Sequence, residues 1–368
     1  MKICIVGTSR CGTTLLRGLI HSHPDIFVFN ETHWLPKMFE FVGTQRVHYK
    51  RLLQIAEKTT WDSGRNLFDV NLAYSKHDSY DSLCADLHQR LRNRGFVTIP
   101  EFMTEFAYAT FGEDVHWGDK TPDYGFYMGI IHELWPNCRF IHITRDGLAT
   151  SRSMSKHPGC QLMIGAGYDN WCSLSYDGLY EKYQARQLTL KAYVSSWRRR
   201  IERIRNEATR IPPELYLECS YDQLLADPIT VLTNIANFSQ LNLDNNWLST
   251  SMDMIRPVRG NVYTPAQHLA SLGPTNLQAI AMEKYGMRHF LALNSLEDAT
   301  ALLQSLNNNT DSEERLHSAI SIFAFARVSR NNSLAKESAT TVAKQLQQKN
   351  LPIDGLSWHS FANEEKSS

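Results

Sequence analysis

The sequence predicts an α/β fold, a parallel β-sheet flanked by helices, followed by a C-terminal helical appendix. Short apolar runs alternate with longer helical stretches, and this order is typical of parallel strands connected by helices. A small, polar, glycine-containing loop joins the first strand to the first helix, as in phosphate-cradling units. Of the 368 residues, 42% are hydrophobic and 21% are charged, so the chain can bury a sizeable core.

The predicted strands are short and occur at four places. Residues 2–6 (KICIV) are rich in β-branched residues, which is typical of a buried strand in a parallel sheet. The other three are residues 26–29 (IFVF), 139–144 (RFIHIT) and 214–219 (ELYLEC). Because helical stretches separate them, we expect all four strands in one parallel sheet.

The first predicted helix covers residues 13–22, which carry leucine and isoleucine at helical spacing. The further helical stretches are a long polar region over residues 37–95, a helix starting within 145–157, a long helix over 185–208 and a helix over 222–241 with a proline near its first turn. Residues 158–180 contain Gly, Asn, Ser and Tyr and predict an irregular loop.

The pattern changes near residue 300. Residues 314–330 and 335–350 are predicted helices, joined by Asn- and Ser-containing linkers, and residues 363–368 are expected to fray. We therefore predict one main α/β domain over residues 1–295 and a C-terminal helical extension over residues 296–368.

The composition excludes several classes of protein. Lys plus Arg and Asp plus Glu both total 38, so the formal net charge is zero and a nucleic-acid partner is not expected. No apolar run approaches the roughly 20 residues of a transmembrane segment, and the N-terminus lacks the features of a signal peptide. The seven cysteines form no CxxC pair and have no zinc-ligand spacing, which predicts reduced thiols in a cytoplasmic protein.

The loop over residues 7–14 (GTSRCGTT) is the first candidate site. Gly7, Gly12 and Thr14 match the template GxxxxGK[ST], but Thr13 stands where the template has its lysine. Without that lysine, ordinary ATPase or GTPase chemistry is not expected. Backbone amides at the helix N-terminus can still hold an anion, and Arg10 adds a cation. The alternative is a glycine turn that binds no ligand.

This P-loop-like segment resembles the 5′-phosphosulfate loop of the sulfotransferase family, whose motif is roughly TxxRSGTT. The matching residues are Thr8, Ser9, Arg10, Cys11, Gly12, Thr13 and Thr14. Cys11 replaces the usual serine and exchanges a hydroxyl for a weaker donor. The resemblance implies that the loop binds the 5′ end of the sulfuryl donor 3′-phosphoadenosine-5′-phosphosulfate (PAPS).

A second candidate site follows the strand at 139–144. Arg145 lies at the strand end, and Ser153 lies eight residues further on, about two turns into the next helix. The planar guanidinium of an arginine is suited to bind phosphate. The pair resembles the sulfotransferase site for the donor's 3′-phosphate. The alternatives are an arginine paired with Asp146 or with a C-terminal carbonyl, and a serine on a helix surface.

The stretch HSHPDIFVFNETHWLPK is similar to protein-tyrosine sulfotransferases and related bacterial sulfotransferases. The resemblance implies that Glu31 is the general base, with burial raising its pKa, and that Lys120 in GDKTPDY stands beside the transferring sulfuryl group. His33 falls where the tyrosine enzymes carry an arginine, and His21, His23 and His33 are rival bases. A helix cap for Glu31 and a solvated surface role for Lys120 remain the alternatives.

Several further residues match the family more loosely. Tyr221, Asp222, Leu224, Asp227, Pro228 and Trp197 are expected to be scaffold residues. Arg256, Arg259 and Gly260 resemble a segment that closes over the 3′-phosphate, with a surface loop as the alternative. The five arginines within residues 195–205 predict a solvated helix face, or else a guide for an anionic acceptor.

The resemblance implies a PAPS-dependent sulfotransferase of the EC 2.8.2 type that transfers a sulfuryl group to a hydroxyl or amine and releases 3′-phosphoadenosine-5′-phosphate (PAP). Arg10 and Lys120 would stabilise the leaving phosphate, and no metal is expected. The expected acceptor is a small molecule, a glycan or a lipid, and the sequence leaves the oligomeric state open. The alternatives are a P-loop kinase for a small metabolite and a non-catalytic nucleotide-binding module.

Overall fold

The computed structural model describes residues 1–60, 71–73, 75–113, 115–176, 178–184, 188–255, 274, 295–306, 312–348, 358 and 361–362. The chain divides into two compact units, Met1–Arg256 and Pro257–Ser368. Between residues 256 and 294 only Pro274 is described, so the domain boundary predicted after residue 295 stays a prediction.

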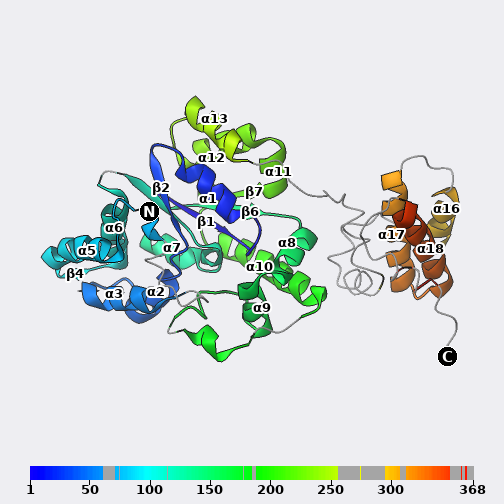
Figure 1. Ribbon diagram of the computed structural model, residues 1–368, viewed down its shortest axis with the longest axis horizontal. Helices are drawn as coiled ribbons and strands as arrows, with labels where there is room; N and C mark the ends of the chain where they lie inside the picture. Colours follow the sequence, from blue (N-terminus) through cyan, green and yellow to red (C-terminus); the bar gives the residue numbers. More distant parts are fainter. Residues whose placement is uncertain are drawn as a thin grey trace. The chain divides into compact units, whose positions relative to one another are not determined.

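A five-stranded sheet forms the centre of the first unit, with the strand order β2-β5-β1-β6-β7 (Figure 1). Every pair of neighbouring strands in it is parallel. The four predicted strands are all present, as β1 (Ile3–Gly7), β2 (Ile26–Asn30), β6 (Arg139–Thr144) and β7 (Tyr216–Ser220). The predicted α/β fold class is therefore confirmed.

The sequence reading missed strand β5 (His116–Lys120), which lies between β2 and β1. Its sequence, HWGDK, has one large apolar residue and two charged ones, so hydrophobic patterning does not identify it. Gly118 permits the close pairing, because a Cβ there would lie 2.8 Å from the Ile3 carbonyl oxygen. Asp119 and Lys120 are buried. Polar partners elsewhere in the fold must therefore stabilise this strand.

Each face of the sheet is covered by its own helices, because successive strand residues point to opposite faces. Ile3 and Ile5 of β1 share a core with α1 (Thr13–His21), α12 (Pro228–Ser239) and α13 (Asn245–Met254). Cys4 and Val6 share the opposite core with helices that include α6 (Ile99–Phe111), α7 (Met128–Leu134) and α10 (Leu190–Ala208).

The long helical region predicted over residues 37–95 is in fact interrupted. It contains α2 (Leu35–Val42), β3 (Val47–His48), α3 (Tyr49–Lys58) and α5 (Tyr80–Arg94), and β3 pairs with β4 (Phe96–Val97), an antiparallel partner. Gly43 and Gly95 follow α2 and α5 with positive φ angles, which glycine adopts easily. Gly43 therefore ends a helix inside the predicted region, whereas Gly95 marks the C-terminal end of that region.

Two further predictions of local structure are wrong. The irregular loop expected over residues 158–180 contains α9 (Pro158–Gly165), which begins with a proline and is capped by the His157 side chain. The single helix expected over residues 222–241 is two helices, α11 (Tyr221–Ala226) and α12. Asp227 separates them by accepting a hydrogen bond from the Thr230 amide (3.2 Å), and Pro228 starts α12.

The remaining elements of the first unit include η1 (Pro122–Phe126), α8 (Gly147–Ser155), η2 (Leu179–Lys182) and η3 (Pro213–Leu215). The second unit contains α16 (Leu296–Ser305), α17 (Ser312–Val328) and α18 (Asn332–Gln348), which include the two helices predicted there. Phe323 of α17 packs edge-on against Trp358, with ring centroids 5.0 Å apart. In the described parts of both units, no helix combines the length and apolar character needed to cross a bilayer.

Candidate active site

The candidate residues gather where the parallel strands end. Residues 8–14 (the 8–14 loop, whose last two residues begin α1) follow β1. Glu31 follows β2, Arg145 follows β6 and Tyr221 follows β7. Lys120 is the last residue of β5. Because all five strands point the same way, their carboxyl ends meet at one edge of the sheet, where α/β folds place their ligand sites.

A cavity of about 500 Å³ opens at this edge. The predicted donor-binding residues that line it are Ser9, Arg10, Gly12, Thr13, Thr14, Arg145 and Ser153. Glu31 lines the same cavity. Thr8 and Cys11 are instead fully buried, and the Cys11 thiol donates a hydrogen bond to the Thr8 carbonyl (2.7 Å). The thiol that replaces the usual serine therefore points into the loop.

Glycine is required at position 12 for two reasons. Gly12 precedes the first turn of α1 with φ 104°, a left-handed conformation. A Cβ there would lie 2.2 Å from Cδ2 of Tyr221. The Tyr221 ring thus packs directly over the loop at the helix N-terminus, where backbone amides and the helix dipole favour an anion.

The two predicted anion motifs are in direct contact. The Arg10 Nε atom donates a hydrogen bond to the Ser153 hydroxyl oxygen (3.1 Å). The Arg145 guanidinium stacks over the Tyr221 ring, 4.6 Å from its centroid. The Arg145 Nε atom is buried and has no hydrogen-bond partner among the described residues. This free donor at the cavity wall is suited to an anion.

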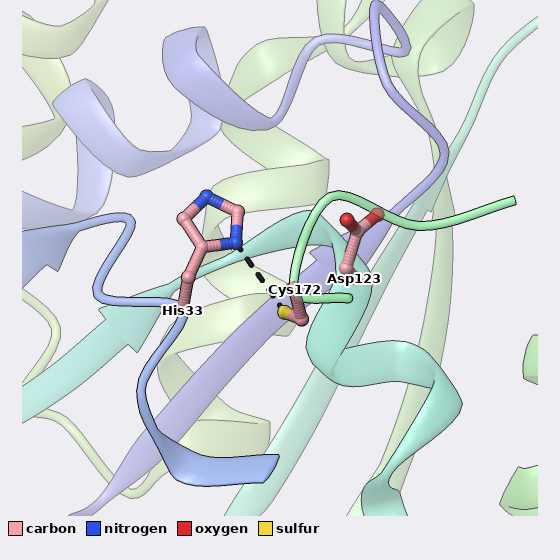
Figure 2. A group of neighbouring side chains, drawn as sticks. All are labelled: His33, Asp123 and Cys172. Carbon is pink, nitrogen blue, oxygen red and sulfur yellow. Dashed lines mark hydrogen bonds between the residues drawn. The ribbon is translucent and has the colours of Figure 1, made fainter. Parts of the chain in front are cut away.

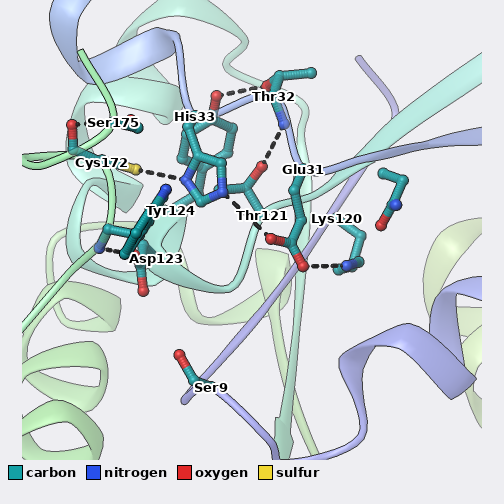
Figure 3. Close-up of polar contacts among 12 residues, drawn as sticks. Ser9, Glu31, Thr32, His33, Lys120, Thr121, Asp123, Tyr124, Cys172 and Ser175 are labelled. Atoms are coloured by element: carbon teal, nitrogen blue, oxygen red, sulfur yellow. Dashed lines mark hydrogen bonds and ion pairs between the residues drawn. The ribbon is translucent and has the colours of Figure 1, made fainter. Parts of the chain in front are cut away.

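Glu31 lies between a lysine and a histidine (Figure 3). One carboxylate oxygen contacts the Lys120 ammonium, and the other lies 3.2 Å from Nε2 of His33. Lys120 also approaches the Thr14 hydroxyl, at 3.5 Å. Lys120 is 1% exposed, so the predicted alternative of a solvated surface lysine does not apply.

The backbone around Glu31 is held in an uncommon conformation. Glu31 and His33 have φ angles of 53° and 57°, in the left-handed region that non-glycine residues rarely adopt. Thr32, between them, is anchored on both sides: its amide donates to the Thr121 hydroxyl (2.9 Å), and its own hydroxyl donates to Asp119 (2.8 Å). These contacts to the end of β5 hold the strained turn in place.

The pKa of Glu31 is lowered to about 2, contrary to the predicted rise. Burial by itself raises the pKa of this carboxyl, but the Lys120 ammonium and the hydrogen bond from His33 together outweigh burial. At Asp119 the effect of burial is the larger one. The pKa of Asp119 rises to about 6, although the hydroxyl groups of Thr121 and Thr32 donate hydrogen bonds to it. Glu31 is therefore fully ionised at neutral pH.

The other histidines proposed as bases lie elsewhere. His21 accepts a hydrogen bond from the Val28 amide (3.0 Å), and His23 contacts the Asn242 carbonyl oxygen (2.8 Å). Both are near the C-terminal end of α1, and neither lines the cavity. His33 does line it, so among these three only His33 stays a rival base.

His33, Asp123 and Cys172 form a buried group whose atoms are close enough to hold a metal ion (Figure 2). The Cys172 sulfur lies 3.3 Å from His33 Nδ1, and burial raises the pKa of its thiol well above the usual value. One oxygen of Asp123 pairs with Arg200 at 2.6 Å, and the other accepts the Trp171 amide. A protonated thiol and an already neutralised carboxylate make poor metal ligands.

Sequence reasoning missed several residues of the site. Tyr221 was expected to be scaffold but lines the cavity, and its position directly after a strand was the available signal. Arg200 was expected on a solvated face but is fully buried, whereas Arg199, Arg203 and Arg205 on the same helix are exposed. Arg256, Arg259 and Gly260 lie outside the described residues.

Comparison with known proteins gives one family match, to the model of the sulfotransferase family over residues 2–245. A Caenorhabditis briggsae protein named as a candidate protein-tyrosine sulfotransferase is 22% identical over 247 residues, which are 67% of this chain and 68% of that protein.

Solved structures of low sequence identity are also similar. The sulfotransferase domain from the curacin biosynthetic pathway is 18% identical, with a TM-score of 0.48 over 71% of this chain and 80% of that domain. The sulfotransferase domain of the Synechococcus PCC 7002 olefin synthase is 18% identical, with a TM-score of 0.43 over 84% and 95% of the two chains.

Proposed function

This chain belongs to the sulfotransferase family, and we propose that it transfers a sulfuryl group from PAPS to a hydroxyl or amine acceptor. One observation carries the proposal: a cavity whose wall includes both anion-binding motifs and the carboxylate of Glu31. Residues from the two motifs contact each other across that wall, so one ligand with two separate anionic groups can reach both.

The donor fits the charges of the cavity. The amides at the start of α1, together with Arg10, face the place proposed for its 5′ phosphosulfate, and Arg145 and Ser153 face the place proposed for its 3′-phosphate. The unpartnered Nε of Arg145 supports this assignment, because a buried donor normally has a partner. When bound, PAPS supplies the transferable sulfuryl group and a phosphate leaving group.

Lys120 and Arg10 are proposed to stabilise negative charge on the leaving phosphate. Lys120 lies between the Glu31 carboxylate and the Thr14 hydroxyl, and Thr14 lines the cavity. Its ammonium can therefore interact with Glu31 and with an anion held near Thr14. Because it is buried, its charge acts with little screening by solvent.

Glu31 is proposed to accept the proton of the acceptor. Its pKa of about 2 makes it a weak base while it is paired with Lys120. An anion that draws Lys120 toward itself would weaken this pairing and make Glu31 more basic, which couples base strength to donor binding. The ionised Glu31 carboxylate accepts a hydrogen bond from Nε2 of His33 at 3.2 Å, and His33 also lines the cavity, so a base role for His33 must be tested in parallel.

The acceptor is proposed to enter beside Glu31 against the 158–180 segment. Pro158, Gly159, Met163 and Trp171 from this segment line the cavity, together with Pro122. This surface is largely apolar, which is compatible with a small organic molecule, a glycan or a lipid that presents one hydroxyl.

A thermal-shift series with PAP, AMP and ATP, each with and without Mg²⁺, tests the proposal. We expect PAP to raise the melting temperature most, with no dependence on Mg²⁺. A rise specific to ATP and dependent on Mg²⁺ would instead favour the kinase. PAP binding without any release of PAP from PAPS, over a broad panel of alcohols, phenols and amines, would favour a non-catalytic module.

A further inference from the structure

Arg200 is a buried charge in a helix whose arginines at 199, 203 and 205 are exposed. It is fully buried in α10, and its guanidinium lies 5.4 Å from the centroid of the Phe126 ring. Burying a guanidinium is costly unless it is paired and hydrogen-bonded. Asp123, also buried, supplies the opposite charge at 2.6 Å.

The nitrogen that meets Asp123 has a second partner. Nη2 of Arg200 carries two hydrogens, and it lies 2.6 Å from Oδ1 of Asp123 and 3.2 Å from the hydroxyl oxygen of Ser9. Ser9 belongs to the 8–14 loop and lines the cavity, 191 residues away in the chain. The buried ion pair therefore extends to the anion-binding loop.

The chemistry of this contact determines its direction. A guanidinium has no acceptor, so the Ser9 hydroxyl must accept the hydrogen bond from Arg200. The single hydroxyl hydrogen of Ser9 is then directed to another group. The neighbouring Cys160 side chain, which also lines the cavity, is a thiol and hence a weak acceptor compared with a phosphate oxygen.

We infer that Arg200 is a positioning residue that makes Ser9 a dedicated hydrogen-bond donor to the 5′-phosphate of the nucleotide. The inference rests on the proposed function, in which the 8–14 loop holds that phosphate. Asp123 holds Arg200 in place by the second hydrogen of the same nitrogen. Asp123 orients Arg200, Arg200 orients Ser9, and Ser9 is the residue that touches the 5′-phosphate.

Titration calorimetry with two nucleotides tests this arrangement. PAP carries the 5′-phosphate, whereas adenosine 3′-monophosphate lacks it and serves as the matched ligand. The variants are S9A, the charge-neutral pair D123N/R200M, and the triple variant that combines them. R203M is the control, because Arg203 is exposed on the same helix and stacks on the same Phe126 ring. Replacing both charges together avoids a buried unpaired aspartate.

We expect S9A to weaken PAP about 10- to 100-fold, the range of a hydrogen bond to a charged group, and to leave adenosine 3′-monophosphate within about twofold. D123N/R200M should weaken PAP about 5-fold alone but add less than about twofold in the S9A background, because both changes remove one interaction. R203M should bind both nucleotides like the wild type.

Equal losses for both nucleotides, or fully additive losses in the triple variant, would overturn the positioning role. If D123N/R200M does not fold, R200K replaces it, since lysine keeps the charge beside Asp123 without the planar fork; unchanged PAP affinity in R200K and S9A would likewise overturn it. A wild-type protein that does not prefer PAP over adenosine 3′-monophosphate would overturn the proposed function itself, which separates the two failures.

Discussion

Arg10 and Ser153 are 143 residues apart in the chain and are joined by a 3.1 Å hydrogen bond from the guanidinium Nε to the hydroxyl oxygen. Arg10 belongs to the loop after β1, and Ser153 belongs to α8 after β6. The contact places the two anion motifs on one cavity wall, because β1 and β6 are adjacent parallel strands.

Replacing Arg145 should remove the preference for a 3′-phosphate. We expect R145M to weaken PAP about 10- to 100-fold, because a charge-assisted hydrogen bond is lost, while AMP, which lacks that phosphate, changes little. Calorimetry with both nucleotides measures the effect. R139M is the control, since Arg139 begins the same strand at the opposite end of the sheet. Equal weakening of PAP and AMP would argue against a 3′-phosphate site.

Removing the Glu31 carboxylate should slow turnover strongly but preserve nucleotide binding. We expect E31Q to release PAP from PAPS about 100- to 10,000-fold more slowly with an active acceptor, the usual contribution of a general base. The Kd for PAP should stay within about tenfold. E40Q, on the exposed surface of α2, is the matched control. If H33Q loses turnover and E31Q does not, His33 is the base instead.

The ion pair between Glu31 and Lys120 should make the free energy of unfolding depend on pH in the acid range. The pKa of Glu31 is about 2 in the folded chain and lies below its ordinary value of 4.5, so the unfolded chain binds the proton more readily. The stabilisation is present above about pH 4.5 and is lost as the pH falls toward 2.

Urea unfolding at several pH values measures this loss. The free energy of unfolding of the wild type should fall relative to E31Q by about 2 kcal/mol between about pH 6 and about pH 3. E40Q should show the same pH dependence as the wild type, since the Glu40 carboxyl that it removes is exposed. Parallel curves for wild type and E31Q would contradict the lowered pKa.

A methyl group at Gly12 should be harmful mainly because it meets the Tyr221 ring. Gly12 has φ 104° and ψ 9°, so an alanine there is strained by its backbone whatever its neighbours. The new Cβ would also lie 2.2 Å from Tyr221 Cδ2. Only this second cost disappears when the ring is removed.

We expect G12A to lower the free energy of unfolding by about 1–3 kcal/mol more in the wild-type background than in the Y221A background, the usual cost of overpacking. Denaturant unfolding of the wild type, G12A, Y221A and the double variant measures this difference. G12A should also weaken PAP binding, because Tyr221 covers the loop. Equal destabilisation by G12A in both backgrounds would show that the ring moves aside freely.

The sequence by itself determined the local parts of this protein. Apolar runs identified β1, β2, β6 and β7, and the glycine spacing of residues 7–14 predicted an anion-binding loop, because these signals lie within a few neighbouring residues. The Arg145 and Ser153 pattern and Glu31 were also found, but from resemblance to a family rather than from periodicity.

Only the tertiary structure decided what these parts do together. The polar strand β5 is stabilised by distant partners, and its Lys120 reverses the expected shift of the Glu31 pKa. The burial of Arg200 depends on Asp123 and Ser9, which come from other elements. A charge is costly or useful according to the groups that surround it, and those groups are brought together only when the parallel strands align their carboxyl ends.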